Sequence, residues 1–497
     1  MNNTTEHTVS AQEFVSKKEY DKALQEITLL KHQISEMKRL IFGSKSERFI
    51  PLGSLDSEQL SLFDIPSSSE ASPPSEEIHY TRKKHIKEKA YPVRTEIPEH
   101  LPRVEEVLEP DINLVEYKKI GEKVTEVLEY NPGHIFVRKI VRPQYIKSDT
   151  ERIVIAELPS LPIPKGNAGA SLLAYLLVSK YADHIPFDRL RKILKRCGAQ
   201  ISKSTINGWF NKSTALLELL YEELEKQLLQ TDYLQADESP IKVQDPNKKG
   251  ALHRGYQWVY RSPVQNLVLF KYNKSRGKEV PKLTLNHFNG ALQTDGYAGY
   301  QHMQTNGNIT LLACMAHARR KFKEALDMDA KRAGFVLSKM QSLYEIERLA
   351  RERQVDCETL KRFRQLYAKP ILEEIEQWLK TNLNQVVPQS AIGKAISYTY
   401  NLWPRLKRYM DDGRYEIDNN LIENAIRPLA LGRKNYLFAG SHEAAQKAAI
   451  MYSLFASCKI NNVDPLKWLT NVFNRISDSK VTALANLLPN KWKVPTE

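Results

Sequence analysis

YLQADESPIKV, residues 233–243, is a run of strand-forming residues that stops on two adjacent acids, Asp237 and Glu238, followed by Ser-Pro. A strand must end somewhere, and Asp and Pro are ordinary residues at such an end. The alternative is that the strand holds a carboxylate at its tip for chemistry, which requires partner acids elsewhere. Strand alternation places Asp237 and Glu238 on opposite faces and does not say which of them would serve.

Further strands follow along the chain. GYQWVYRS at 255–262 and NLVLFKY at 266–272 are rich in β-forming residues, a Lys-rich helical stretch covers 276–287, and GALQTDGY begins at 290. Antiparallel strands followed by a crossover helix to another strand predict a mixed α/β sheet. From about 312 to 410 the pattern is helical and highly charged, which predicts an all-helical insertion.

A second strand-like run also stops on an acid, Asp295, and turns at Gly296. Two strands of one sheet that both end on Asp place those side chains close together if their tips are neighbours. The best candidate for a third acid is Glu423, in a stretch that Asp418 could cap as a helix. The apolar residues that this helix would turn inward are Leu421, Ile422, Ala425 and Ile426.

Carboxylates are the oxygen ligands that Mg²⁺ and Mn²⁺ prefer. Two such ions about 4 Å apart activate a water or sugar hydroxyl and stabilise the leaving oxygen of a phosphodiester. If Asp237, Asp295 and Glu423 converge, we therefore expect Mg²⁺ or Mn²⁺, with two ions in the site. The alternative remains open, because a chain with 59 acids offers many triplets. The two aspartates could be turn residues, and Glu423 could pair with Arg427 for about 0.2–0.5 kcal/mol.

The composition favours a nucleic-acid partner. The 497 residues predict about three or four domains, and 73 Lys and Arg against 59 Asp and Glu give a formal net charge of +14. Such a balance suits a polyanion, although it can also be a solvated surface. The four cysteines lie far apart and fit neither a disulfide framework nor a Cys-x-x-Cys metal site. With no signal-like start and no long apolar run, we expect a cytoplasmic protein without a membrane segment.

The N-terminal third is predicted to contain three parts. Residues 1–50 carry a heptad-like seam from Tyr20 to Ile41, which fits a short coiled coil or an amphipathic helix packed on its own domain equally well. Residues 51–92 are rich in Ser, Pro and Glu and then in basic residues, which indicates a flexible linker. Residues 93–163 include an alternating pattern around Asn-Pro-Gly, from Lys123 to Val141, which predicts a β-hairpin in a small β-rich module.

Residues 164–225 are predicted to form a helix-turn-helix. Two short helical patterns are followed by Cys197-Gly198-Ala199 and by a third helix that begins near Ser202. Helical hairpins also occur without DNA, but the many Lys and Arg residues here favour a last helix that enters a major groove. At its start we expect DNA contacts from Lys203, Ser204, Thr205 and Asn207.

Six motifs in order resemble the large transposase of the insertion sequence 66 family, from about residue 20 to 475. They are FGSKSER at 42–48, STINGW at 204–209, QADESP at 235–240, LQTDGYAGY at 292–300, CMAHARRKF at 314–322 and IDNNLIENAIRPLALGRKNYLFAGS at 417–441. The resemblance implies an RNase H-like core at 226–310 and 411–455, a helical insertion at 311–410 and a C-terminal helical region at 456–497. By motif match, Asp237, Asp295 and Glu423 form a DDE triad, and Glu238 is a supporting acid.

The chain departs from the family at one point. The segment before the helix-turn-helix lacks the cysteines that usually bind zinc there, so no structural zinc is expected. Two residues cannot close a tetrahedral zinc site, so Cys314 and His317 are interpreted as packing or local-structure residues. Basic residues of the matched motifs are expected at the DNA backbone, with an exposed helical face nearly as good an interpretation: Arg319, Arg320, Lys321, Arg433 and Lys434.

The sequence thus predicts a multi-domain α/β protein that acts as a Mg²⁺-dependent DDE transposase. It would bind the terminal inverted repeats of its element, hydrolyse the phosphodiester at each end and join the 3′-OH to target DNA. We expect a homo-oligomer on DNA and small accessory proteins of the same element. A catalytically inactive DNA-binding regulator is the main alternative. A carboxylate glycosidase also uses paired acids, but would need neither the helix-turn-helix nor the basic charge.

Overall fold

The computed structural model describes residues 160–494 except 165, 246–249 and 307, together with 133, 135, 144–146 and 153–155. Strands β1 (Gln144–Ile146) and β2 (Ile153–Ile155) pair antiparallel within the segment for which a β-rich module is predicted. The predicted N-terminal helix, the linker and nearly all of the predicted hairpin from Lys123 to Val141 lie outside the described residues.

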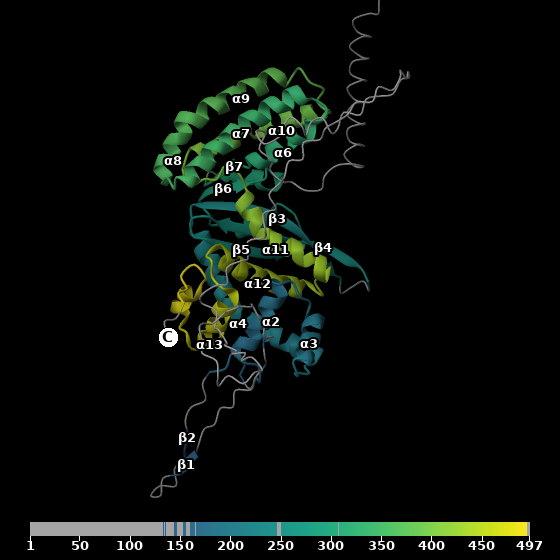
Figure 1. Ribbon diagram of the computed structural model, residues 1–497, viewed down its shortest axis with the longest axis vertical. Coiled ribbons are helices and arrows are strands. Elements are labelled where there is room, and N and C mark those ends of the chain that lie inside the picture. The colour runs from purple at the N-terminus through teal and green to yellow at the C-terminus, as the bar shows by residue number, and fades with distance from the viewer. Residues whose placement is uncertain are drawn as a thin grey trace, which may run out of the picture. The chain divides into compact units, whose positions relative to one another are not determined.

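A mixed sheet of five strands, in the order β5-β4-β3-β6-β7, forms the framework of the described residues (Figure 1). β3, β4 and β5 are antiparallel neighbours, whereas β6 and β7 run parallel to β3. The predicted mixed α/β sheet is therefore confirmed. The strands are β3 (Tyr233–Gln244), β4 (Leu252–Ser262), β5 (Leu267–Asn273), β6 (Gly290–Thr294) and β7 (Ile309–Ala313).

β3 is the central strand, and it does not stop at Asp237 and Glu238 as predicted. It continues through both acids and through Pro240 to Gln244, paired with β4 over this length. Its first four residues are all buried, and from Ser239 onward buried positions alternate with more exposed ones. This pattern is typical of a strand that is covered on both faces at its start and on one face toward its end. Helix α5 (Glu279–Thr284) lies between β5 and β6, and the 3-10 helix η3 (Ala298–Asn306) lies between β6 and β7.

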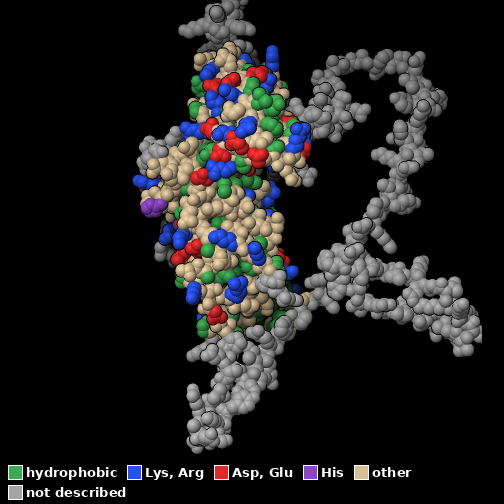
Figure 2. Space-filling model, turned by 90° about the vertical axis from the view of Figure 1, so that its left-hand side faces the viewer, with side chains coloured by type: hydrophobic (Ala, Val, Ile, Leu, Met, Phe, Trp, Pro, Cys, Tyr) green, Lys and Arg blue, Asp and Glu red, His purple; other side chains and the backbone are tan. Residues whose placement is uncertain are grey.

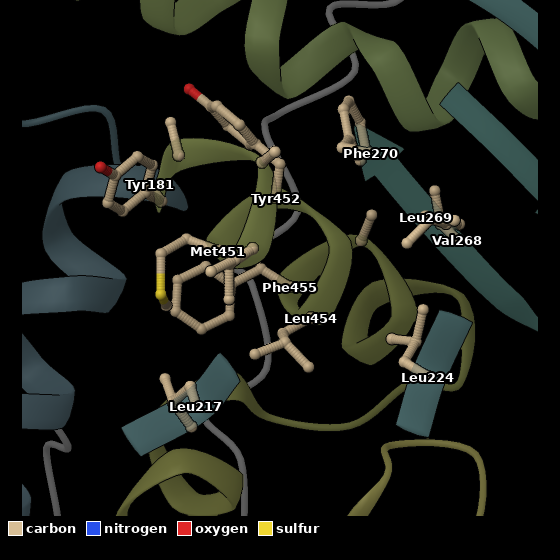
Figure 3. Close-up of a cluster of buried hydrophobic side chains, with 14 of the residues drawn as sticks. Tyr181, Leu217, Leu224, Val268, Leu269, Phe270, Met451, Tyr452, Leu454 and Phe455 are labelled. Atoms are coloured by element: carbon tan, nitrogen blue, oxygen red, sulfur yellow. The ribbon is translucent and has the colours of Figure 1, made fainter. Parts of the chain in front are cut away.

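Helix α12 (His442–Ile460) packs along β5 and is buried over most of its length. Figure 3 shows its side chains Met451, Tyr452, Leu454 and Phe455 between helix α4 and strand β5. The partners in this cluster are all buried: Leu217 and Leu224 from α4, and Val268, Leu269 and Phe270 from β5. Helix α11 (Asn420–Tyr436) contacts β3 and β4.

Three helices occupy the region predicted as a helix-turn-helix: α2 (Ala170–Tyr181), α3 (Phe187–Arg196) and α4 (Lys203–Leu229). The turn before α4 contains Gly198, whose φ of 85° suits glycine. α4 begins after Ser202, as predicted, but it is 27 residues long. Its C-terminal half carries Leu217, Leu220, Leu224 and Leu228 into the same core as the sheet, so this helix belongs to both regions.

The helices between β7 and α11 have a hydrophobic core of their own, which includes Phe322, Met340 and Trp403. On the face shown in Figure 2, acidic and basic side chains are interspersed over this part of the chain rather than segregated. The elements are α6 (Met315–Ala325), α7 (Ala330–Glu352), α8 (Cys357–Phe363), the π-helix η4 (Arg364–Ala368), α9 (Lys369–Asn382), α10 (Ala391–Leu406) and the 3-10 helix η5 (Lys407–Met410).

The C-terminal segment returns to the first helices. Helix α13 (Pro465–Arg475) packs against α2, and the short 3-10 helices η6 (Ile476–Asp478) and η7 (Val481–Leu487) follow it, with η7 against α4. Of the helices within the described residues, none is long and apolar enough to cross a membrane.

Candidate active site

Asp237 lies on β3, and Asp295 directly follows the neighbouring parallel strand β6. Tyr233 pairs with Ala291 and Gln235 with Gln293, so the same register carried two residues further brings Asp237 opposite Asp295. The β6 strand ends at Thr294, and Gly296 takes a φ of 93°, which lets the chain turn away directly after the acid. The Asp295 Oδ1 atom accepts a hydrogen bond from the Tyr297 N–H at 2.8 Å.

Two buried glutamines, Gln235 and Gln293, each stand two residues before one of these acids. The Gln235 side chain donates to Gln293 Oε1 at 2.9 Å and to the Asp418 carbonyl at 3.1 Å. Gln293 donates to the Glu416 carbonyl at 2.7 Å and accepts from the Tyr233 hydroxyl at 2.6 Å. The segment that leads into α11 is therefore hydrogen-bonded to the centre of the sheet.

Glu423 lies in the first turn of α11, directly after this segment. The N-cap residue is Asn419 rather than Asp418, although Asp418 Oδ1 still accepts from the Asn420 N–H at 2.9 Å. Asn419 in turn donates its backbone N–H to Cys314 Sγ at 3.2 Å. Ile422, Ala425 and Ile426 are buried and Leu421 is half-buried, so the helix turns the predicted apolar side toward the core.

The three predicted acids interact through their charges. Burial raises the pKa of Asp237 to about 8, and the negative charges of Glu238, Asp295 and Glu423 add to this effect. Two of these charges come from the other predicted members of the triad. Asp237 thus sits in an excess of negative charge, which a cation would relieve.

Glu238 belongs to the supporting structure, as the family resemblance implies. Its carboxylate is almost fully buried and accepts from Arg276 Nε at 2.7 Å. Arg276 lies over the Tyr297 ring at 4.2 Å from the ring centre, and the Tyr297 hydroxyl donates to the Arg276 carbonyl at 2.9 Å. The ion pair joins the segment after β5 to β3, and the contacts with Tyr297 join the same segment to the loop after Asp295.

His317 faces the site more closely than the sequence predicts. Its Nε2 lies 3.9 Å from Glu423 Oε1, while its Nδ1 is buried and has no hydrogen-bond partner. Glu423 therefore has the His317 imidazole beside it, and among the described residues no ion pair joins Glu423 to Arg427, the pairing that the alternative interpretation predicted. Cys314, by contrast, has the local-structure role predicted for it, since burial raises the pKa of its thiol to about 12 and its sulfur accepts from Asn419.

The donor chemistry at this place fits a divalent cation, because the carboxyl group of Asp237 is buried and is near the negative charges of Glu238, Asp295 and Glu423. Within the described part of the chain, no three or more His, Cys, Asp or Glu side chains lie in a group that could hold a metal ion. Asp237, Asp295 and Glu423 therefore remain the ligands that the sequence predicts, and in this structure they do not form such a group.

At the start of α4, the predicted DNA-binding residues Lys203, Ser204 and Asn207 are exposed and Thr205 is half-buried. Ser202 caps this helix: its Oγ accepts from the Thr205 N–H at 3.0 Å and lies 2.8 Å from the hydroxyls of Ser204 and Thr205. The two hydroxyls thus already serve the helix start, which leaves Lys203 and Asn207 as the better candidates for a ligand.

The basic residues predicted near the motifs differ in exposure. Arg319 and Arg320 are half-buried on α6, whereas Lys321 is exposed. Arg433 on α11 is also half-buried and donates to the Pro240 carbonyl, and burial lowers its pKa. Arg433 therefore supports the fold. Of the two residues expected to contact DNA here, the exposed Lys434 is the better candidate.

Sequence reasoning missed Gln235 and Gln293. Both stand two residues before an acid, as Gln-Ala-Asp at 235–237 and Gln-Thr-Asp at 293–295, and this repeated spacing is a usable signal. A glutamine in a strand that is otherwise apolar needs a buried hydrogen-bond partner, so the repetition of one at the same distance from two candidate acids indicates a shared structure.

Three protein-family models match parts of this chain. The model of the family "Transposase IS66 family" matches residues 165–447. "Transposase C of IS166 homeodomain" matches residues 29–105, and "IS66 C-terminal element" matches residues 453–490.

Similar curated proteins come from Sinorhizobium fredii. The uncharacterized protein y4jD is 29% identical over 489 residues, covering 93% of this chain and 94% of the relative. The uncharacterized protein y4hP is 30% identical over 498 residues, covering 94% and 89%. The fold and the matches define a protein of the transposase class with an α/β domain. The chain belongs to the IS66 transposase family, which confirms the resemblance found in the sequence.

Proposed function

We propose that this chain is a DNA transposase with an RNase H-like core and a DDE triad. It binds the terminal inverted repeats of its insertion sequence, hydrolyses the phosphodiester at each end and joins the freed 3′-OH to target DNA. The observation that carries the proposal is the pairing of Gln235 with Gln293, two residues before Asp237 and Asp295, and the charge of Glu423 acting on Asp237 supports it.

Each acid has a role in this proposal. Asp237, on β3, and Asp295, directly after β6, hold the cation. Glu423 approaches from α11 and completes the set, and the hydrogen bonds of Gln235 and Gln293 keep its helix in place. Bound Mg²⁺ or Mn²⁺ would activate the attacking oxygen and stabilise the leaving oxygen. His317, beside Glu423, orients that carboxylate.

DNA binding is proposed for the start of α4 and for exposed cations near the acids, with the net charge of +14 as support. Each phosphate that the protein neutralises contributes a slope of about −0.9 to log K against log salt. Binding that is insensitive to salt would contradict the proposal as a whole.

Replacing Asp295 by Asn tests the proposed chemistry, because the change removes a charge and nearly preserves shape. We expect Asp295→Asn to bind the element's ends but to lose Mg²⁺-dependent cleavage of a supercoiled donor plasmid. Glu358→Gln, an exposed acid on α8, is the matched control and should cleave normally. Cleavage by the Asp295→Asn protein at the wild-type rate would refute the assignment. End binding without cleavage by the wild-type chain would favour the inactive regulator.

A further inference from the structure

Helix α11 has an exposed stripe that begins at Glu423. Arg427, Leu431 and Lys434 are exposed at positions four, eight and eleven residues after this acid. At 100° per residue these three and Glu423 lie within about 80° of arc on the helix surface, and Lys434 is about 16 Å from Glu423 along the axis. The opposite side of the helix is buried through Ile422, Leu429 and their neighbours. The stripe therefore leads away from the candidate active site along one face.

Two exposed apolar side chains continue this stripe beyond the helix end. Leu437 is 65% exposed and Phe438 is 43% exposed. Leu437 has a φ of 53°, in the left-handed region that glycine adopts easily and bulky residues rarely adopt. Strained residues of this kind persist only where the surrounding structure holds them, and they cluster at functional sites.

The backbone that carries them is fastened to β3. The Ala439 N–H donates to the Lys242 carbonyl at 2.9 Å, and the Gln244 N–H donates to the Ala439 carbonyl at 2.8 Å. Leu437 and Phe438 are thus presented to solvent from a fixed position. Lys242, which is exposed on β3, adds a further cation beside them.

The alternation of cations and apolar side chains indicates the kind of ligand. Within the described residues, neither Arg427 nor Lys434 is in an ion pair, so both charges are available to phosphates. A closed duplex presents phosphates and sugars to such a face and gives an exposed phenyl ring little to contact. An unpaired strand presents phosphates together with base faces, which stack on aromatic side chains.

We propose that this face of α11 and the adjoining loop bind an unpaired DNA strand as it leaves the active site. Arg427 and Lys434 bind its phosphates, Leu431 contacts a sugar or base, and Phe438 stacks on a base. The proposal rests on the proposed function, because it takes the scissile phosphate to lie near Glu423. It adds that the two DNA strands are separated where the DNA meets this surface.

The test uses the full chain and two fluorescein-labelled duplexes, one blunt and one with a single-stranded tail, with a chelator present so that binding is measured apart from cleavage. We expect the wild type to bind the tailed duplex more tightly. Phe438→Ala should lower affinity for the tailed duplex by about 5- to 100-fold and leave the blunt duplex nearly unchanged. Arg427→Ala and Lys434→Ala should weaken both and reduce the salt slope by about 0.7–0.9 each.

Matched controls come from α13, where Leu466 is 40% exposed and Lys467 is exposed. Leu466→Ala and Lys467→Ala should bind both duplexes as the wild type does. Equal binding of the tailed duplex by Phe438→Ala and wild type overturns the proposal, as does an equal loss in Leu466→Ala. If tail-dependent binding requires Phe438 but the wild type cuts no donor, the proposed chemistry fails and this surface assignment stands.

Discussion

Gln235 and Gln293 lie beside each other on adjacent strands, and their amide groups bind backbone carbonyls of the segment before α11. Because each backbone carbonyl is fixed relative to the helix that follows it, these bonds determine where Glu423 stands relative to Asp237 and Asp295. The acids would supply the chemistry, whereas the glutamines determine the geometry. Such supporting side chains are needed because small displacements in an active site are costly.

Replacing Gln293 by Leu tests this role. The Tyr233 hydroxyl and the Glu416 carbonyl would lose their partner, at a cost of about 1–3 kcal/mol in unfolding free energy. We also expect donor cleavage to fall steeply, because Glu423 loses its positioning. Urea unfolding and plasmid cleavage measure the two effects.

Gln257 supplies the control, since it is equally buried on β4 but donates to the Ala445 carbonyl of α12 and not to the segment before α11. Gln257→Leu should lose comparable stability and keep cleavage activity. If both variants lose activity to the same extent, the effect is one of general stability and Gln293 has no special positioning role.

Lys180, near the end of α2, is half-buried, and no acid within the described residues forms an ion pair with it. The loss of solvent around its amine lowers the pKa of Lys180 to about 8. Its Nζ lies 4.3 Å from the Phe187 ring centre and 5.1 Å from that of Tyr436, so aromatic rings offset part of the cost of burying the charge. Between the folded and unfolded pKa values the unfolded chain binds more protons, and stability therefore rises as pH increases from about 8 to about 10.5.

Lys180→Met should remove this dependence. Near pH 7 the variant should be more stable than the wild type by about 1–3 kcal/mol, and near pH 10 the difference should largely vanish. Urea unfolding at the two pH values measures it, with Lys459→Met, an exposed lysine of α12, as the control that should change neither value. A stability gain that is the same at both pH values would contradict the role assigned to the amine.

At the scale of elements, two hydroxyl groups of α12 bind backbone amides at one edge of the sheet. Ser453 Oγ accepts from the Phe270 N–H at 2.7 Å, and Ser457 Oγ accepts from the Val268 N–H at 3.0 Å. β5 is the edge strand, and its backbone groups would otherwise be available to another chain. The four-residue spacing of the serines on an otherwise buried helix matches alternate residues of the strand.

Removing both hydroxyls should weaken this edge. In Ser453→Ala with Ser457→Ala, two buried amides lose their acceptors, and we expect a loss of about 2–4 kcal/mol and faster hydrogen exchange at Val268 and Phe270. Ser213→Ala is the control, because that buried hydroxyl has no hydrogen-bond partner and its removal should be nearly neutral. Unchanged exchange at the two amides would show that α12 does not protect β5 through its serines.

Local patterns were enough to predict some elements and not others. The start of α4 follows from Ser202 and its cap, and β3 follows from its composition and alternation. β7 was not predicted, because ITLLA at 309–313 is short and nearly continuously apolar, and periodicity cannot distinguish such a run from a helix. The predicted boundary between the core and the helical insertion, at 310 and 311, consequently falls within this strand.

The candidate site shows the same division. Asp295 could be picked out because it directly follows a strand-like run, and Glu423 because a family motif contains it. Asp237 was picked out as a strand end, which was wrong, because β3 continues through it to Gln244. The contacts of His317 with Glu423, of Cys314 with Asn419 and of Arg433 with Pro240 join residues that are distant in sequence. No local pattern carries that information, since it depends on how the helices pack on the sheet.

At the scale of the whole chain, the helices from α6 to η5 leave the sheet and return to it at neighbouring points. The Met315 N–H donates to the Ile417 carbonyl at 3.1 Å, and Arg408 donates to the Leu311 carbonyl at 2.8 Å. A long segment can be inserted between Asp295 and Glu423 without separating them, because its two ends are bonded together. Residues inside the insertion therefore affect the site through the contacts that bring the chain back to the sheet.

Arg364 joins the helices of the insertion to the segment that leads back to the sheet. Its guanidinium group pairs with Glu347 through two hydrogen bonds of 2.8 Å, and it also donates to the carbonyls of Tyr409 at 2.8 Å and Asp412 at 2.9 Å. Both charged side chains are almost completely buried. Removing one member of such a pair leaves a buried charge without compensation and costs about 3–5 kcal/mol.

Arg364→Leu should therefore destabilise the insertion and release the segment that leads to Glu423. We expect a lower unfolding free energy and lost donor cleavage, while binding of the element's ends through α4 is retained. Arg348→Ala breaks two exposed ion pairs of α7, with Glu345 and Glu352, and should change stability by less than about 1 kcal/mol. Full cleavage activity in a destabilised Arg364→Leu protein would mean that the insertion and the three acids are independent, and loss of end binding in the same protein would mean that the helices α2 to α4 depend on the insertion too.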